Sequence, residues 1–137
     1  MRKLTANIDP AEIGRITLDE ALALLPTPDG KRSAAVFEHG TLQVKLYAPG
    51  GSDPQSPHTR DEVYVVARGE GWFVIGELSG EQTGERNAEL SKERRHRFGA
   101  NDVLFAKAGT RHRFENFSDD LAVWVMFYGP EGGEGDQ

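Results

Sequence analysis

Two histidines and one glutamate stand at spacings that can build a metal centre. Three residues separate His58 from Glu62, and His112 follows 50 residues after Glu62. Two imidazoles and one carboxylate form a donor set that leaves coordination positions open for water or substrate. On a straight strand His58 and Glu62 would lie about 13 Å apart, so one ion can bind both only if the chain turns at 59–61. A shared proton is the alternative means of neutralising a buried Glu62.

The elements that must position these side chains are short strands separated by turns. We expect one helix at about 18–25, with Thr17 and Glu20 as a capping box at its start and Pro26 after its end. Polar segments at 49–57 and 77–93 are expected to be loops, the second of them an exposed loop or a loose hairpin. Alternating apolar and polar residues predict strands at 34–38, 41–47, 63–67, 72–75, 95–98, 102–105, 111–115 and 121–128. About nine or ten strands with frequent turns are typical of a closed or double-sheet antiparallel barrel.

Composition excludes several classes of function. The chain has 137 residues, which is enough for one ordinary domain. It has no cysteine, which excludes thiolate metal sites and cysteine nucleophiles and is compatible with the cytoplasm. A net charge of −6 argues against nucleic acid as a partner. No apolar run is long enough to span a membrane, and the first residues lack a signal-peptide pattern. The expected organisation is an arm with a short helix over 1–33, a barrel over 34–128 and a flexible acidic tail over 129–137.

The residues around the candidate ligands resemble the two motifs of the cupin family. The first motif is carried here by Gly50, Ser56, His58, Glu62 and Gly69, and the second by Asn101, Lys107, Gly109, His112 and Asn116. The resemblance covers about 34–128 and implies an all-β double-stranded β-helix, or jelly-roll barrel, with the site inside. It implies a divalent metal, of which iron, manganese, zinc and nickel suit these donors.

This chain departs from the family pattern at three positions. Ser56 stands where cupins have a first histidine ligand, so its hydroxyl is expected beside the metal ligands or next to an open coordination position. Asn101 replaces a glycine, and asparagine is expected to adopt the same left-handed conformation. Lys107 replaces a proline.

Aromatic residues are expected around the site. Alternation from Glu62 directs Tyr64 into the barrel, and alternation from His112 does the same for Phe114. Phe114 and Phe73 are candidate walls of a cavity, or ordinary barrel filling. Tyr64 is the candidate catalytic proton donor.

Two surface features have open interpretations. The basic run 92–97, together with Arg111 and Arg113, is either a solvated strand face or a patch that attracts anions. Strands that are apolar on both faces, with Val63 and Val65 on one of them, need a cover, which is either a second subunit or the N-terminal arm. We expect a homodimer.

Three functions are therefore considered. The first is a metal-dependent enzyme acting on a small molecule, of oxygenase type or of isomerase or hydrolase type. The second is a non-catalytic protein that binds a small molecule, with or without metal. The third is a stability or interaction module.

Overall fold

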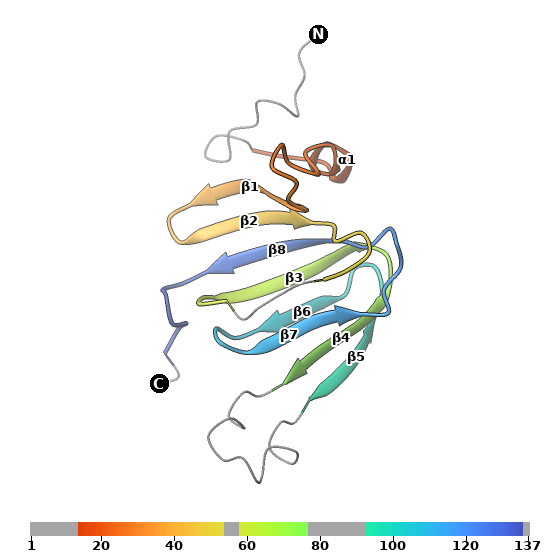
Figure 1. Cartoon of the computed structure of the whole chain (residues 1–137). Helices are drawn as coiled ribbons and strands as arrows, with labels where there is room; N and C mark the ends of the chain where they lie inside the picture. The colour runs from red at the N-terminus through yellow and green to blue at the C-terminus, as the bar shows by residue number, and fades with distance from the viewer. Residues whose placement is uncertain (1–13, 54–57, 77–92, 136–137) are drawn as a thin grey trace.

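The computed structural model describes residues 14–53, 58–76 and 93–135. Within them the chain forms one helix, α1 (Leu18–Leu22), and eight strands: β1 (Ser33–His39), β2 (Leu42–Tyr47), β3 (Asp61–Arg68), β4 (Gly71–Gly76), β5 (Arg94–Phe98), β6 (Val103–Ala106), β7 (Arg111–Glu115) and β8 (Ala122–Tyr128). These strands form a five-stranded sheet in the order β1-β2-β8-β3-β6 and a three-stranded sheet in the order β5-β4-β7 (Figure 1). The mostly β, double-sheet architecture with one short helix confirms the predicted fold class. The predicted loop or loose hairpin at 77–93 lies outside the described residues except for its last position.

Local sequence signals account for the turns and the helix start. Thr17 caps α1 by accepting a hydrogen bond from the backbone of Glu20, whose carboxylate accepts one from the backbone of Thr17. The capping box is therefore confirmed, although the helix ends at Leu22 rather than near residue 25. Asn101 has φ = 76°, as expected for an asparagine in the place of a glycine. Gly69 has φ = +96° between β3 and β4, and a Cβ there would lie 2.7 Å from the Cα of Leu121.

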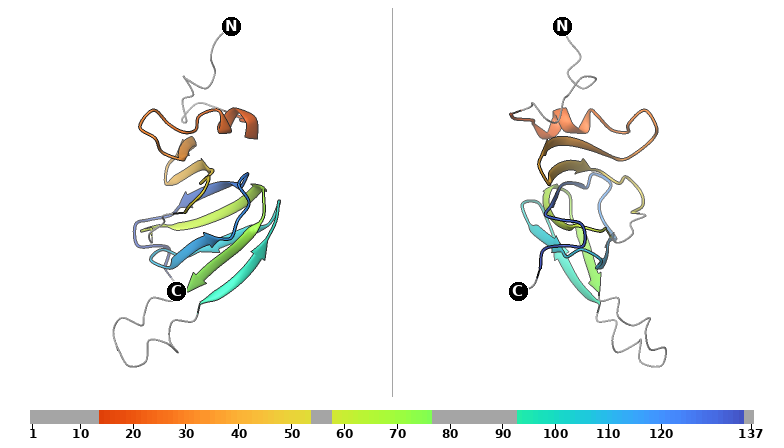
Figure 2. Two further views of the ribbon diagram at one scale, coloured as in Figure 1. Left: turned by 45° about the vertical axis from the view of Figure 1, so that its right-hand side comes forward. Right: turned by 90° about the vertical axis from the view of Figure 1, so that its left-hand side faces the viewer.

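The five-stranded sheet separates two apolar cores. Its inner face packs against the three-stranded sheet, and the large buried side chains there include Tyr64 and Phe73. Its outer face over β1, β2 and β8 packs against α1, with Leu46 at the centre of that second core. Figure 2 shows from two further sides that α1 lies at the β1 end of the molecule, far from β4 and β5. Along β2, the side chain of Leu46 therefore points outward to α1 and that of Tyr47 points inward.

The outer face over β3 and β6 is less covered. Val103 is 65% exposed and Phe105 is 46% exposed, while Val63 and Val65 opposite them on β3 are half-buried. None of the helices in the described part of the chain is both long and apolar enough to cross a membrane.

Candidate metal centre

Three segments far apart in the sequence bring the predicted ligands together. Glu62 is the second residue of β3, in the five-stranded sheet, and His112 is the second residue of β7, in the three-stranded sheet. His58 lies just before β3, separated from it by a bend at 59–60. Its carbonyl oxygen accepts a hydrogen bond from the backbone N–H of Gly109, at 2.8 Å, which ties the segment before β3 to the turn before β7. The chain thus turns between His58 and Glu62, as a common site for them requires.

The donor atoms of the three side chains converge. Nδ1 of His58 lies 2.7 Å from Oε2 of Glu62, and Nε2 of His112 lies 3.0 Å from the same oxygen. One ligand atom from each residue can be chosen so that all three lie within 4.8 Å of one another. Glu62 and His112 are 1% and 5% exposed, whereas the His58 side chain is 40% exposed. The cluster is therefore closed on the side of the core and open at His58.

The hydrogen bonds of the cluster fit a bound cation. Nδ1 of His112 lies 2.9 Å from the carbonyl oxygen of Thr110. That nitrogen must donate a hydrogen, so a neutral His112 ring directs the lone pair of Nε2 at Glu62. Nε2 of His112 and Oε1 of Glu62 are buried without a hydrogen-bond partner in the described structure, although Nε2 lies close to Oε2. Two facing lone pairs need a proton or a metal ion between them. Ligands about 2.1 Å from one ion lie about 3 Å apart in adjacent positions, which matches the two short distances.

The charges of the cluster are strongly coupled. Burial by itself would raise the pKa of Glu62, but the close approach and the charges of the His112 and His58 rings together lower it to about 2. Burial would lower the pKa of His112, but its contact with the Glu62 carboxylate and the Thr110 carbonyl raise that pKa above its ordinary value. Without a metal, both shifts favour a carboxylate beside a protonated His112. A metal ion must displace that proton.

Asp61 is a structural residue of the site that the sequence analysis did not single out. It is 6% exposed at the start of β3. Its two carboxylate oxygens accept hydrogen bonds from the backbone N–H of Ala108, at 2.9 Å, and of Glu134, at 3.1 Å. It therefore holds the turn before β7 and the segment after β8 against the strand that carries Glu62. An aspartate at a strand start next to a glutamate is equally typical of a surface residue, so no pattern in the sequence distinguishes Asp61.

A cavity of about 490 Å³ opens beside the cluster. Tyr64 lines it, and its ring centroid lies 5.9 Å from that of His112. Phe73 and Phe114 pack against Tyr64 at centroid distances of 5.7 and 5.1 Å, but they are not lining residues. They belong to β4 and β7 and fill the space between the sheets, so the structure differs here from the expected cavity walls. Ser56 lies outside the described residues. The residues that line the cavity are Gly30, Lys31, Arg32, Ser33, Lys45, Tyr47, Pro49, Ser52, His58, Glu62, Tyr64, Val125 and Phe127.

Lys45 and Tyr47 are cavity residues that the sequence analysis missed. Both lie on the mixed face of β2, opposite the apolar face of Leu42, Val44 and Leu46. The Tyr47 hydroxyl donates a hydrogen bond to Asp53, and burial and that carboxylate raise its pKa.

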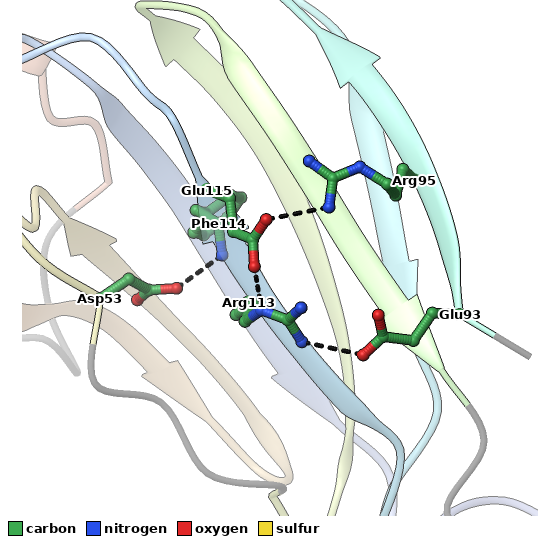
Figure 3. Close-up of polar contacts among 6 residues, drawn as sticks. All are labelled: Asp53, Glu93, Arg95, Arg113, Phe114 and Glu115. Carbon is green, nitrogen blue, oxygen red and sulfur yellow. Dashed lines mark hydrogen bonds and ion pairs between the residues drawn. The ribbon is translucent and has the colours of Figure 1, made fainter. Parts of the chain in front are cut away.

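Asp53 connects the loop after β2 to β7. Its second carboxylate oxygen accepts a hydrogen bond from the backbone N–H of Phe114, at 2.7 Å (Figure 3). Since β7 is an edge strand of its sheet, this bond gives an edge N–H group an acceptor and fixes the loop beside the cavity.

The basic run on β5 is a surface network. Arg95 and Arg97 both stack on Trp72, with guanidinium-to-centroid distances of 5.4 and 5.7 Å. Figure 3 shows part of the network, in which Arg113 also contacts Glu115. The further ion pairs are Arg95–Glu115, Arg97–Glu70 and Arg113–Glu93. These cations already have carboxylate partners, which favours the solvated strand face over an anion-attracting patch. Lys92 lies outside the described residues.

Comparison with known proteins gives consistent matches. The model of the Cupin_2 family, described as the cupin domain, matches residues 43–128. An uncharacterised protein of Streptomyces coelicolor, SCO3923, is 33% identical over 116 residues, which are 83% of this chain and 94% of the relative. A solved cupin-2 domain protein from Shewanella frigidimarina has a TM-score of 0.54 at 16% identity, with 83% of this chain and 94% of the other covered. The DMSP lyase DddQ from Ruegeria pomeroyi has a TM-score of 0.52 at 18% identity, with 84% and 55% covered. The two structural matches show a shared fold.

Proposed function

The chain belongs to the Cupin_2 family, as the match over residues 43–128 shows, and from this premise we propose that it holds a divalent metal ion and acts on a small molecule. The proposed ligands are His58, Glu62 and His112. The ion would lie between the two sheets, next to the cavity through which a small molecule can reach it.

One observation carries the proposal, namely the buried and convergent donor set. Glu62 and His112 come from different sheets and are almost fully buried, yet Oε1 of one and Nε2 of the other have no hydrogen-bond partner among the described residues. Leaving buried polar atoms unsatisfied costs about 1–3 kcal/mol each. A cation bound by both residues would remove that cost.

The protein residues have separate roles in the proposed chemistry. A bound ion would supply oxygenase-type chemistry if it is iron, or polarise a carbonyl group in isomerase or hydrolase chemistry if it is zinc, manganese or nickel. Glu62 supplies the negative charge, and the carbonyl oxygen of Thr110 holds the ring of His112 in the tautomer that binds metal through Nε2. Tyr64 lines the cavity beside His112 and is the proposed proton-bearing group.

Elemental analysis of protein purified without a histidine tag tests the ligand set. We expect about one ion per chain in the wild type and at least a tenfold lower content in Glu62→Gln and in His58→Ala/His112→Ala. His96→Ala is the matched control, because His96 is an exposed histidine on β5 outside the cluster, and it should keep its metal. An unchanged metal content in the double variant would exclude this ligand set.

Chelation separates an enzyme from a binding protein. If the protein is an enzyme of the proposed kind, removal of the ion abolishes turnover and metal addition restores it. If it is a non-catalytic binding protein, ligand affinity survives chelation.

We further propose that a second copy of the chain covers the outer face of β3 and β6. Cross-strand pairing places Val63 beside Phe105 and Val65 beside Val103, which makes one contiguous apolar face. Phe105→Asp should lower the mass measured by light scattering from that of a dimer to that of a monomer. Leu42→Asp, at an exposed apolar position on β2, is the control and should remain dimeric. A wild-type protein that is monomeric at high concentration would exclude the dimer.

A further inference from the structure

The cavity beside the proposed metal centre carries an excess of positive charge. Three basic side chains line it, namely Lys31, Arg32 and Lys45, and Glu62 is the one acidic residue among the described lining residues. The carboxylate of Glu62 is already engaged by the two histidines. A small molecule that enters the cavity therefore meets cations that have no acid within the cavity to neutralise them.

Lys45 is the unusual member of this group, because it lies on the inner face of the sheet. Its cross-strand partner is Val125, and the partner of Val125 on the next strand is Tyr64. Directly opposite residues point to the same face of a sheet, and Val125 and Tyr64 both belong to the inner core. The Lys45 side chain therefore points to the inner face of the sheet, where it lines the cavity.

The ammonium group of Lys45 has no ion-pair or hydrogen-bond partner in the described part of the chain. Lys31, by contrast, lies 3.8 Å from the carboxylate of Asp29. A half-buried charge without a partner is unfavourable in a folded protein. Residues that contribute unfavourably to folding but face a cavity are typical of sites shaped for a ligand.

Arg32 adds a second, fixed cation to the lining of the cavity. Its Nε donates a hydrogen bond to the carbonyl oxygen of Ala48, at 2.8 Å, and the backbone N–H of Ala48 donates one to the carbonyl oxygen of Arg32, at 3.0 Å. These two bonds hold the guanidinium in place, and its terminal nitrogens have no hydrogen-bond partner among the described residues. They can donate to an anionic group.

The sheet register gives the size of the ligand. Lys45, Val125 and Tyr64 form one row across β2, β8 and β3, and the next inward row ends at Glu62. Two strand spacings across and one two-residue step along separate the Cα atoms of Lys45 and Glu62 by about 12 Å. The two side chains extend toward each other over part of this distance, so a molecule of a few carbon atoms would bridge the ammonium and an ion at the cluster.

We propose that the cavity binds a small organic anion, with a carboxylate at one end held by Lys45 and Arg32 and its other end directed at the metal centre. This inference rests on the proposed function for the orientation of the ligand, but not for the anion subsite itself. Lys45 is a specificity-determining residue in this scheme. It selects a charged molecule over its neutral amide.

Calorimetric titration with malonate, succinate and glutarate, in the metal-loaded and in the chelated protein, tests the subsite. Lys45→Met should weaken the tightest of these by about 10- to 100-fold, since an ionic hydrogen bond of this kind contributes about one to two powers of ten in affinity. Lys45→Arg should restore most of it. Succinamide should not bind, and Lys107→Met, at an exposed lysine outside the cavity lining, should leave the affinity unchanged. Phosphate is the probe for an anion of another class.

Each outcome decides one of the two proposals. Binding that depends on Lys45 in a protein that takes up no metal would retain the subsite and overturn the proposed function. Metal uptake with dicarboxylate affinity that is equal in the wild type and Lys45→Met, or with no binding of any dicarboxylate at 10 mM (about the weakest affinity worth measuring), would overturn the subsite. Tighter binding of phosphate than of every carboxylate would overturn the carboxylate assignment. Thermal unfolding of Lys45→Met provides a readout of folding, and we expect its melting temperature to equal or exceed that of the wild type.

Discussion

The pH dependence of stability, measured with and without metal, is the most demanding test of the cluster. In the metal-free protein the pKa of Glu62 is lowered from 4.5 to about 2. A carboxyl group whose pKa is lowered by folding stabilises the folded protein above its unfolded pKa, and this stabilisation is lost as the pH falls. A shift from 4.5 to about 2 corresponds to about 3 kcal/mol of stability, which declines between pH 4.5 and 2. The pKa of His112 is raised above 6.5, so its contribution is complete below pH 6.5 and is lost as the pH rises. The two shifts report one interaction and are not added. The metal-free protein should therefore be most stable between about pH 4.5 and 6.5.

A bound metal should stabilise the protein more as the pH rises, whereas the metal-free protein loses the contribution of His112 at high pH. Because the ion displaces one proton from His112, its dissociation constant should rise tenfold for each pH unit below the raised pKa of His112. A free metal concentration of 100 times the dissociation constant adds about 2.7 kcal/mol, which for a chain of this size is about 9 °C in melting temperature. One pH unit lower, the same concentration adds about 1.4 kcal/mol, or about 5 °C.

The assay is thermal unfolding between pH 2 and 8, in chelator and in excess Ni²⁺, of protein without a tag. The difference in melting temperature should be largest at pH 8 and should vanish near pH 5. Glu62→Gln should remove both the metal shift and the acid-side decline, whereas His39→Ala, at an exposed histidine on β1, should keep both. A metal shift of equal size at pH 5 and pH 8, or one that persists in Glu62→Gln, would show that the ion binds elsewhere.

The remaining predictions concern the scaffold. Gly69→Ala should lower the free energy of unfolding by about 2–3 kcal/mol in denaturant titration, because its Cβ would collide with the backbone of Leu121; Gly99→Ala, where a Cβ meets open space, should change it little, and equal effects would contradict this account. Thr17→Ala should cost about 1 kcal/mol through loss of the cap on α1, and a change below 0.3 kcal/mol (roughly the additivity error) would show that α1 is held by packing alone. Asp61→Asn should weaken metal binding by about 10- to 100-fold without touching the ion, and an affinity equal to that of the wild type would exclude its positioning role.

The sequence predicted the strand pattern and the side chains that converge in the His58, Glu62 and His112 cluster from the same alternation of inward and outward residues along a strand. Alternation with period two survives in β3, where Glu62 and Tyr64 face inward, and in β7, where His112 and Phe114 do. Asn101 could be recognised as a turn residue, because asparagine shares the left-handed conformation with glycine. The resemblance to the two cupin motifs then indicated that the strands of Glu62 and His112 contribute to one site.

The inward face of β2 could not be predicted. Its apolar residues indicate which face is buried in a core, but not that this core lies on the outside of the barrel under α1. Alternation along β2 therefore places Lys45 and Tyr47 on its mixed face without indicating that they line the cavity. Alternation fixes the relative orientation of neighbours along a strand, and only tertiary packing decides which side is the interior.

The outer core explains how a lysine can be tolerated on the inner face of a barrel strand. Leu46 on β2 and Ala21 on α1 are fully buried together on the outer side of the sheet, so β2 is anchored from its outer side, and on its inner face Tyr47 packs against the inner core. At the other end of the barrel, Tyr64, Phe73 and Phe114 fill the interior with contacting rings. The outer core under α1 and the aromatic core between the two sheets thus both stabilise the fold. The inner face of β2 can therefore carry the charged side chain of Lys45, which a ligand would need, without loss of either core.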